Sequence, residues 1–423
     1  MIRWITVTLG TAPYRAISAG LEVDRLDVRD LLDREGNSPA LMREAVERGR
    51  RLLEAGRKVV VCCEHGMSRS NAIAAGILAT HEGVSLNTAI RKVLFATGED
   101  SIRLEVLATL RAALQQPDGQ PARRNSQPRV LVTGATGMIG AQLCAEPLPA
   151  GIAALVPVLS GSLDLRRDAV PLDLLVREQE VDVIVHLAHP RISTTNRSLG
   201  EAVTMLKNVL DVCRENSVRL VYASSCEIYS GHEGTIVVDE GLIPRPATTL
   251  GIAKLLAEQL IETYRRQYGL RAAVLRLTTV YGGSASRPAF LWNFIEKAVR
   301  HAPIQTHRCP AGFPTVDLLH VNDVCRALFA AVETGSDTDF NLGGGQNTGT
   351  DELARHVVEL ASSASRISRL AVERRLCNLT ADFRRASEVL GWRPEISIRD
   401  GIRQLLSGKP QNDIVAREPR VPI

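Results

Sequence analysis

The chain has 423 residues, about two to three times the usual size of one domain, so at least two domains are expected. Apolar residues make up 45% and charged residues 23%, close to globular averages, which excludes a disordered or collagen-like chain. The net charge of +4 is spread without a basic block, so neither nucleic acid nor a membrane surface is expected as a partner.

Neither the start of the chain nor its cysteine content indicates secretion. The first residues, MIRWITVTLG, predict a strand and lack the basic-then-apolar layout of a signal peptide. No run of 18 apolar residues predicts a transmembrane helix. The eight cysteines are unevenly spaced and do not form a disulfide framework, so a reduced, cytoplasmic protein without a metal site is expected.

Residues 115–128 separate two parts of the chain. Their sequence, QQPDGQPARRNSQP, contains no aliphatic residue except Ala122 and has the composition of a linker. The linker divides a first unit at 1–114 from a second at 129–408, and the polar residues 409–423 are expected to form a frayed tail. In the second unit, short apolar runs alternate with helix-like stretches, which predicts an α/β fold with a parallel sheet covered on both faces.

The sharpest local signal is KVVVCCEHGMSRSNAIAAGIL at residues 58–78. Three valines predict a buried strand, a helix follows Ser70, and between them five residues, Gly66 included, separate Cys63 from Arg69. A loop that closes onto a helix N-terminus points backbone N–H groups inward and makes a cradle for an anion. The same field stabilises a thiolate at Cys63, and Arg69 offers a planar fork matched to two phosphate oxygens. The alternative is a buried structural cysteine followed by a helix-capping serine.

This segment resembles the signature loop of the protein tyrosine and dual-specificity phosphatases, and the resemblance covers roughly residues 1–114. In that family the cysteine attacks phosphorus, the arginine holds the phosphoryl group, and the hydroxyl after the arginine assists breakdown of the phosphocysteine. The resemblance places these roles on Cys63, Arg69 and Ser70. Two features depart from the family: Cys62 stands where His usually precedes the nucleophile, and the unit is short.

The family also uses an aspartic acid, about thirty residues upstream, to protonate the leaving oxygen. The segment LDVRDLLDREGN offers Asp27, Asp30 and Asp33. Asp30 fits the usual separation best and is therefore the predicted general acid. Asp27 and Asp33, in the same segment, stay open as alternatives.

The second unit begins with a glycine-rich segment, VLVTGATGMIGAQL. Its glycines stand between a predicted strand and a predicted helix at the start of a domain, where a Rossmann dinucleotide site needs them. They allow a tight turn and a close approach of a pyrophosphate to the helix N-terminus. The residues of this segment predicted to contact the cofactor are Gly134, Thr136, Gly137, Met138, Ile139 and Gly140.

These glycines and the segments VDVIVHLAHP, VYASSCEIY, GIAK and LRLTTVYGG resemble the extended short-chain dehydrogenase/reductase family over residues 129–407. The family consists mostly of nucleotide-sugar epimerases, dehydratases and reductases. The resemblance implies a Rossmann-type doubly wound sheet with a C-terminal substrate-binding part and NAD or NADP as cofactor. It also implies that Leu187, Ala188 and Lys254 contact the cofactor. Residues 160–188 are most similar to the dTDP-4-dehydrorhamnose reductase branch, which suggests Asp164 and Leu165 for the adenine pocket. No acidic residue ends the second strand, LVPVLS, and no Arg follows closely, so the choice between NAD and NADP stays open.

The chemistry of that family depends on a Tyr-x-x-x-Lys pair and a Ser. The Lys lowers the Tyr pKa and holds the nicotinamide ribose, while Tyr and Ser polarise the reacting oxygen. Ser225 and Lys254 occupy the Ser and Lys positions, but Leu250 stands where the Tyr belongs. No tyrosine occurs between Tyr229 and Tyr264, so a shift of register does not restore the pair.

Either another group takes over from the missing tyrosine, or the domain binds a dinucleotide without ordinary hydride chemistry. The near candidates, each of which can equally be structural, are Tyr229, Glu227 and His189. Three functions remain: a bifunctional enzyme of sugar or nucleotide-sugar metabolism, a phosphatase with a dinucleotide-binding sensor or recruitment domain, and a scaffold with both sites inactive. The intact phosphatase-like loop argues against the third. The partners to consider are a phosphorylated small molecule or a phosphoprotein, a nucleotide sugar, and a second copy of the chain docked through the second domain.

Overall fold

The computed structural model describes residues 1–17, 21–99, 102–114, 127–159, 161, 163–190, 195–283, 288–310, 312–373 and 376–407. The chain folds into two compact units. Unit 1 comprises Met1–Ser126, Leu163–Asp182 and Lys207–Val218, and unit 2 comprises Gln127–Ser162, Val183–Leu206 and Arg219–Ile423. Residues 115–126 of the predicted linker and the predicted tail at 409–423 lie outside the described residues.

The N-terminal part of unit 1 contains a four-stranded sheet. Its strands lie in the order β1 (Arg3–Trp4), β2 (Leu9–Pro13), β4 (Val59–Cys63) and β3 (Asp24–Asp27). All residues of β4 are buried, as expected for a central parallel strand with both faces covered. Strands β2 and β3 both pair in parallel with β4, with Pro13 opposite Cys63 and Asp27 opposite Cys62. The segments that follow β2 and β3 therefore emerge on either side of the loop that follows β4.

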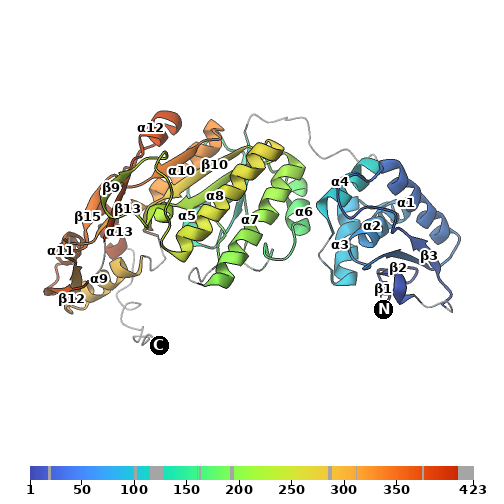
Figure 1. Cartoon of the computed structure of the whole chain (residues 1–423), viewed down its shortest axis with the longest axis horizontal. Helices are drawn as coiled ribbons and strands as arrows, with labels where there is room; N and C mark the ends of the chain where they lie inside the picture. The colour runs from blue at the N-terminus through green and yellow to red at the C-terminus, as the bar shows by residue number, and fades with distance from the viewer. Residues whose placement is uncertain are drawn as a thin grey trace. The chain divides into compact units, whose positions relative to one another are not determined.

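Within the described residues, helices and a short 3₁₀ helix complete this part of the chain, and Figure 1 labels the α-helices. They are η1 (Tyr14–Ala16), α1 (Pro39–Glu54), α2 (Ser68–Glu82), α3 (Leu86–Thr97) and α4 (Leu104–Ala113). Helix α2 packs against α1, α3 and α4, and its residues from Ser70 to Ala79 are all buried. Its four alanines and Gly76 suit close packing on every side. The loop after β4 is thus anchored on a buried strand and a buried helix.

Unit 1 also contains α6 (Val170–Glu178) and the second half of α7 (Asn196–Asn216). Nη2 of Arg111 donates to Oδ2 of Asp173 over 2.7 Å, and both side chains are buried. Burial raises the pKa of Asp173, but the charges of Arg111 and Arg177 and a hydrogen bond from Asn216 outweigh it, so the pKa lies below its ordinary value. The carboxylate is therefore ionised and bonded on both oxygens, which is the condition for a buried charge to be tolerated.

Unit 2 is built on a six-stranded parallel sheet. Its strands lie in the order β14 (Asp339–Leu342), β10 (Ala272–Leu277), β8 (Arg219–Ser225), β7 (Val183–His186), β5 (Arg129–Thr133) and β6 (Ala154–Pro157). Helices α5 (Met138–Ala145) and α10 (Val321–Thr334) share one hydrophobic core with these strands. Helix α8 (Thr249–Tyr268) contacts β8 and β10 and crosses the near side of the sheet in Figure 1. The predicted Rossmann-type parallel sheet is confirmed.

The C-terminal part of unit 2 adds three small sheets and four helices to this frame. The strands are β11 (Thr279–Tyr281), β13 (Thr315–His320) and β15 (Asn347–Gly349), then β12 (Ile304–Arg308) with β16 (Ile367–Ala371), and β9 (Gly234–Val238) with β17 (Cys377–Ala381). The helices are α9 (Ala289–Val299), α11 (Thr350–Leu360), α12 (Arg384–Leu390) and α13 (Ile398–Ser407). A second core, formed chiefly by α9, α11 and α13, holds this part together.

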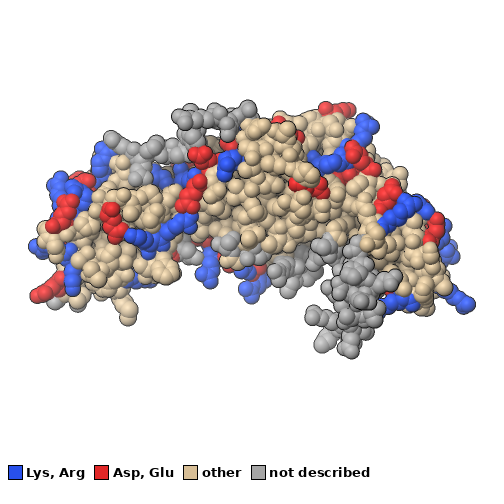
Figure 2. Space-filling model, turned by 180° about the vertical axis from the view of Figure 1, so that it is seen from behind, with Lys and Arg blue, Asp and Glu red and all other residues tan. Residues whose placement is uncertain are grey.

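Positive and negative side chains are interspersed over the face shown in Figure 2, in keeping with the small net charge. Within the part of the chain that the structure describes, no helix is both long enough and apolar enough to span a bilayer.

Candidate active sites

The first candidate site is the loop between β4 and α2. Strand β4 ends at Cys63, and α2 begins at Ser68, so residues 64–67 lead directly from the strand to the helix N-terminus. Gly66 has φ of +69°, and a Cβ built there would lie 2.3 Å from the backbone nitrogen of Pro13. Only glycine fits this backbone and this space, so the loop is fixed against the end of β2.

The Cys63 thiol lies at the centre of this loop and is only 2% exposed. The Gly66 N–H points at its sulfur over 3.2 Å, and Oγ of Ser70 lies 3.4 Å from it. Burial raises the pKa of Cys63, but hydrogen bonds from the Ser70 hydroxyl and from the backbone of Ser70, Met67 and Gly66 outweigh it, so the net pKa is lowered. The neighbouring Cys62 is fully buried, and burial raises its pKa to about 12. Of the two adjacent thiols, only Cys63 is prepared to ionise.

Arg69 connects this loop to the segment that follows β3. Its Nη1 donates to the carbonyl oxygens of Arg29, at 3.1 Å, and Leu31, at 2.8 Å. Asp30 stands between these two carbonyls in the chain and is exposed. The structure therefore places Ser70 beside Cys63, and Arg69 ties the start of α2 to the segment carrying Asp30. The catalytic roles of these residues stay predictions.

Asp27, one of the alternatives to Asp30, is occupied by another partner. Nε and Nη2 of Arg29 bond both carboxylate oxygens of Asp27 at 2.8 to 3.1 Å. The hydrogen bond from the Arg29 side chain lowers the pKa of Asp27, which disfavours the protonated form that a general acid needs. Asp33 is exposed and lies beyond the residues that Arg69 holds.

Three residues near the loop were missed in the sequence analysis. Nη1 of Arg3 donates to the Gly66 carbonyl over 3.3 Å, and its Nη2 pairs with Glu99 at 2.7 Å. The Cζ of Arg29 lies 3.3 Å from the centroid of the Tyr14 ring. These residues belong to β1, to the turn after β2 and to the segment after β3, and no motif in the sequence links them to Cys63.

The packing at Gly66 gives the first testable prediction. Gly83, at the other end of α2, has φ of +68°, but a Cβ added there would meet no atom within 4 Å, so it reports backbone strain alone. Gly83→Ala is expected to lower the free energy of unfolding by about 1–2 kcal/mol. Gly66→Ala adds a collision with Pro13, so it is expected to destabilise more. The free energies of unfolding are measured by urea denaturation. Equal decreases in the two variants would show that the loop is not packed tightly against β2.

The second candidate site is the glycine loop between β5 and α5. Gly134 has φ of +72°, and a Cβ there would lie 2.7 Å from the nitrogen of Ala188. A Cβ at Gly140 would lie 2.2 Å from the carbonyl oxygen of Gly134. Helix α5 begins at Met138 after Gly137, with no side-chain cap on its first N–H groups. A glycine-rich turn that leads into a helix without a side-chain cap fits a pyrophosphate, so the residues present suit a dinucleotide.

The other predicted cofactor residues are divided between unit 2 and unit 1. Thr136 is exposed on the glycine turn, Ile139 is in the first turn of α5, and Leu187 follows β7 with its N–H bonded to the carbonyl of Thr133. Asp164 and Leu165 belong to unit 1. Both oxygens of Asp164 bond Arg166, whose side chain lowers the pKa of that carboxyl, and the carbonyl of Leu165 accepts a hydrogen bond from Asn208. Their role at the adenine stays a prediction.

Lys254 lies beside the end of β8, which Ser225 terminates. Its Nζ donates to the carbonyl of Ala223 over 2.6 Å and to the hydroxyl of Tyr222 over 3.2 Å. Burial lowers the pKa of Lys254 to about 8, and the carboxylate of Glu258 only partly opposes this. Oγ of Ser225 accepts from the N–H of Glu227 over 3.2 Å. The predicted Ser and Lys are thus on neighbouring elements, β8 and α8.

Leu250, which stands at the position of the family's tyrosine, is half-buried in the first turn of α8. Among the described residues, no other tyrosine is placed to take over its role. Tyr229 is fully buried, its hydroxyl accepts from Arg276 over 2.9 Å, and burial raises its pKa to about 12. Tyr222 bonds Lys254, but burial raises its pKa well above the ordinary value. Both tyrosine hydroxyls are therefore buried and hydrogen-bonded, as expected of structural residues.

The two remaining candidates differ in their contacts. Burial lowers the pKa of His189 to about 4, and the charge of Lys254 adds to this effect, so its imidazole is neutral near pH 7. Oε2 of Glu227 accepts from the hydroxyl of Thr248 over 2.9 Å. Thr248 caps α8 two residues before Leu250, so Glu227 is the candidate that is held beside the turn carrying Leu250.

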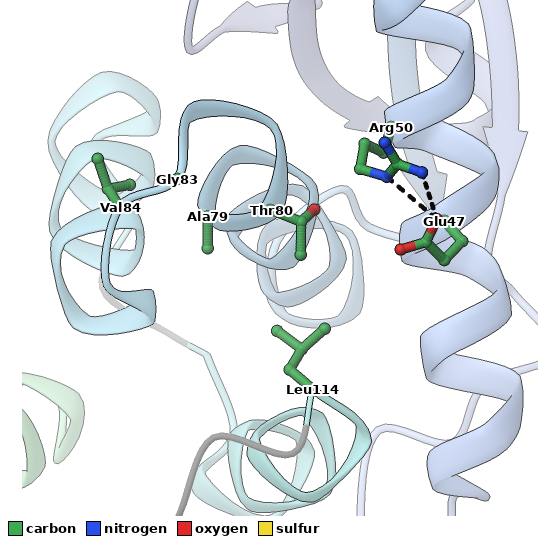
Figure 3. A pocket seen from close by; sticks show the side chains of 7 residues that line it. All are labelled: Glu47, Arg50, Ala79, Thr80, Gly83, Val84 and Leu114. Atoms are coloured by element: carbon green, nitrogen blue, oxygen red, sulfur yellow. Dashed lines mark hydrogen bonds and ion pairs between the residues drawn. The ribbon is translucent and has the colours of Figure 1, made fainter.

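A surface hollow lies at the C-terminal end of α2 (Figure 3). Its lining includes an ion pair between Arg50 and Glu47, with Thr80 as the other polar side chain. Cys63 stands before the opposite end of this 15-residue helix, about 20 Å away at 1.5 Å per residue. With its charges paired and no nucleophile in its lining, the hollow has none of the groups expected of a catalytic site.

Comparison with known proteins covers the second part of the chain. Residues 130–343 match the model of the NAD dependent epimerase/dehydratase family. The UDP-glucuronate 4-epimerase of Thermodesulfobacterium geofontis is 29% identical over 245 residues, which are 55% of this chain and 73% of that protein. A crystal structure of the Thermotoga maritima UDP-glucose 4-epimerase with UDP-glucose is 25% identical, covers 66% of this chain and 97% of its own, and has a TM-score of 0.57. The structure of RMD from Pseudomonas aeruginosa with NADPH is 23% identical, covers 66% of this chain and 98% of its own with a TM-score of 0.58, and so shares the fold.

Proposed function

Because this chain belongs to the NAD dependent epimerase/dehydratase family, we propose that it joins an NAD(P)-binding, nucleotide-sugar-modifying domain at 129–408 to a cysteine-dependent phosphomonoesterase at 1–114. The proposal for the N-terminal domain rests on one observation: in the loop between β4 and α2 the Cys63 sulfur lies 3.2 Å from the Gly66 N–H and 3.4 Å from Oγ of Ser70, and these hydrogen bonds lower its pKa. The chain is then a bifunctional enzyme of sugar or nucleotide-sugar metabolism.

In the proposed hydrolysis, Arg69 binds two phosphoryl oxygens and the thiolate of Cys63 attacks phosphorus. The S–P bond forms as the bond from phosphorus to the leaving oxygen breaks, and Asp30 gives its proton to that oxygen. Water then attacks the phosphocysteine, with the Ser70 hydroxyl near the departing sulfur and Asp30 accepting a proton from the water. The products are an alcohol and inorganic phosphate, and the thiolate is restored.

In the second domain, the N–H groups at the start of α5 would hold the pyrophosphate of NAD or NADP, and the ammonium of Lys254 would hold the nicotinamide ribose. The cofactor, when bound, supplies hydride transfer. Ser225 would polarise the reacting oxygen of the sugar. Relatives named as acting on UDP-glucose and UDP-glucuronate support a nucleotide sugar as the substrate class.

Two further proposals concern assembly and location. Ile252 and Leu256 are 41% and 44% exposed on successive turns of α8, and a second copy of the chain docked on this domain would cover them. The proposed cytoplasmic location rests on the eight cysteines, which are unevenly spaced in the sequence and are all free thiols in the structure.

A second function is favoured by Leu250. Leucine has no proton to exchange, so the dinucleotide domain would bind NAD(P) as a sensor or recruit a nucleotide sugar while the phosphatase does the chemistry. A phosphatase assay on phosphopeptides and sugar phosphates, run with and without NAD(P), separates the two functions. A cofactor effect on hydrolysis supports the sensor, and turnover of the cofactor itself supports the bifunctional enzyme.

Asp30 provides a prediction specific to the hydrolytic step. A proton donor matters when the leaving group is a poor one and much less when it is an activated phenol, because a phenolate leaves without help. Asp30→Asn is expected to slow hydrolysis of an alkyl phosphate by about 10²-fold or more while slowing an aryl phosphate far less. Asp33→Asn is the matched control, and if it shows that pattern instead, the acid has been misassigned.

A further inference from the structure

Two residues from opposite sides of Cys63 meet at the carboxyl end of the N-terminal sheet. Tyr14 directly follows Pro13, which lies opposite Cys63 in the β2–β4 pairing. Arg29 comes two residues after Asp27, which lies opposite Cys62 in the β3–β4 pairing. Since β4 lies between β2 and β3 and neighbouring strands are about 4.8 Å apart, the two flanking strands are about 10 Å apart.

The Arg29 side chain spans this distance. Its Cζ lies 3.3 Å from the centroid of the Tyr14 ring, a stacked cation–π contact, and Arg25 approaches the same ring at 5.5 Å. The contact, called here the Tyr14–Arg29 clasp, therefore closes across the end of β4, where the Cys63 loop begins. The hydrogen bond to Asp27 chiefly raises the pKa of Arg29, and Glu64, the residue after Cys63, adds a smaller electrostatic contribution.

The clasp is held at several points. The Arg29 guanidinium bonds both oxygens of Asp27, and its backbone carbonyl accepts from Arg69. On the other side, Pro13 packs so closely against Gly66 that a Cβ built on Gly66 would lie 2.3 Å from the Pro13 nitrogen. This packing fixes the start of the turn that carries Tyr14. The clasp is thus anchored on both flanking strands, and the thiol at the end of the strand between them is only 2% exposed.

We propose that the Tyr14–Arg29 clasp restricts access to Cys63 and selects compact phosphomonoesters, such as sugar phosphates, over phosphopeptides. The selection of substrates rests on the proposed phosphatase function, whereas the restriction of access does not. A phosphopeptide must place main chain on both sides of its phosphorylated residue. A sugar phosphate presents one small leaving group and passes beside the closed clasp.

The test measures access to Cys63 in the full-length protein with two thiol reagents of different size, iodoacetamide and fluorescein maleimide. Rates of labelling at Cys63 are followed by peptide mass spectrometry, with Cys63→Ser as the background. Tyr14→Ala removes the ring, and Tyr14→Phe keeps it. The ratio of the fluorescein maleimide rate to the iodoacetamide rate is expected to rise roughly threefold or more in Tyr14→Ala and to stay near that of the unaltered protein in Tyr14→Phe.

Arg15→Ala, an exposed neighbour of Tyr14 in the same turn, is the matched control and is expected to leave the ratio unchanged. An unchanged ratio in Tyr14→Ala, or the same rise in Tyr14→Phe, overturns the clasp. For substrates, the ratio of kcat/KM for a phosphopeptide to that for a sugar phosphate is expected to rise in Tyr14→Ala. A shifted labelling ratio in a protein that hydrolyses neither ester keeps the clasp and removes the phosphatase function, so the two failures are distinguishable.

Discussion

Cys63→Ser protein is expected to hydrolyse phosphomonoesters roughly 10⁴-fold or more slowly than the unaltered chain while still binding inorganic phosphate. The loop lowers the pKa of a thiol by hydrogen bonds from Ser70 and from backbone N–H groups, but a hydroxyl starts too far above neutrality to ionise there. The N–H groups and Arg69 stay in place, so the anion site persists. Steady-state hydrolysis and calorimetry with phosphate measure the two properties separately.

Two further variants sharpen this prediction. Arg69→Ala is expected to lose both hydrolysis and phosphate binding, because it removes the proposed phosphate ligand together with the hydrogen bonds to the carbonyls of Arg29 and Leu31. Cys62→Ala is the matched control, since Cys62 is fully buried and burial raises its pKa to about 12. Hydrolysis that survives in Cys63→Ser, or that is lost equally in Cys62→Ala, would remove Cys63 as the nucleophile.

The second large effect is expected at Leu250. Purified protein should bind NAD or NADP, because the glycine loop and Lys254 contact pyrophosphate and ribose and do not depend on the missing hydroxyl. Oxidation or reduction across several nucleotide sugars should be slow or absent, since losing a positioned acid or base typically costs about 10²- to 10⁴-fold. Calorimetry measures the binding, and the absorbance of the reduced cofactor measures the turnover.

Leu250→Tyr tests the cause directly. The new hydroxyl would stand four residues before Lys254, one turn along α8, and is expected to raise the turnover rate while leaving cofactor affinity in place. Gly134→Val is the control for binding, because even its Cβ would lie 2.7 Å from the nitrogen of Ala188. Rapid turnover by the unaltered protein would show that another group replaces the tyrosine. Glu227 would then be the first residue to mutate. Absence of binding to either dinucleotide would remove the cofactor assignment.

The parts of both sites that the sequence predicted are those carried on one continuous segment. Cys63, Gly66, Arg69 and Ser70 lie in a single strand–loop–helix, and the glycine loop is another, so local spacing was enough to find them. The Rossmann-type sheet was predictable for the same reason, because each apolar run and each helix is a local pattern.

Contacts between segments distant in the sequence were not predictable. Arg3 reaches the Cys63 loop, and Tyr14 meets Arg29, only because the sheet order is β1-β2-β4-β3, and no periodicity in the sequence sets that order. The bond between Glu227 and Thr248 likewise joins two elements that the sequence keeps apart. The grouping of α6 with unit 1 was also missed, since the linker composition suggested that everything after residue 128 folds together.

The buried amine of Lys254 has a consequence for the stability of the protein. Its pKa is about 8 in the fold, against about 10.4 in an unfolded chain. Between these two values the unfolded chain binds more protons than the folded one, so the free energy of unfolding contributed by this residue increases as the pH rises from 8 towards 10. At neutral pH the protein therefore keeps an ammonium group at the expense of its own stability. Lys254→Met should flatten this part of the curve of unfolding free energy against pH. The difference in unfolding free energy between the two proteins at neutral pH measures the stability lost by keeping a positive charge at the end of β8.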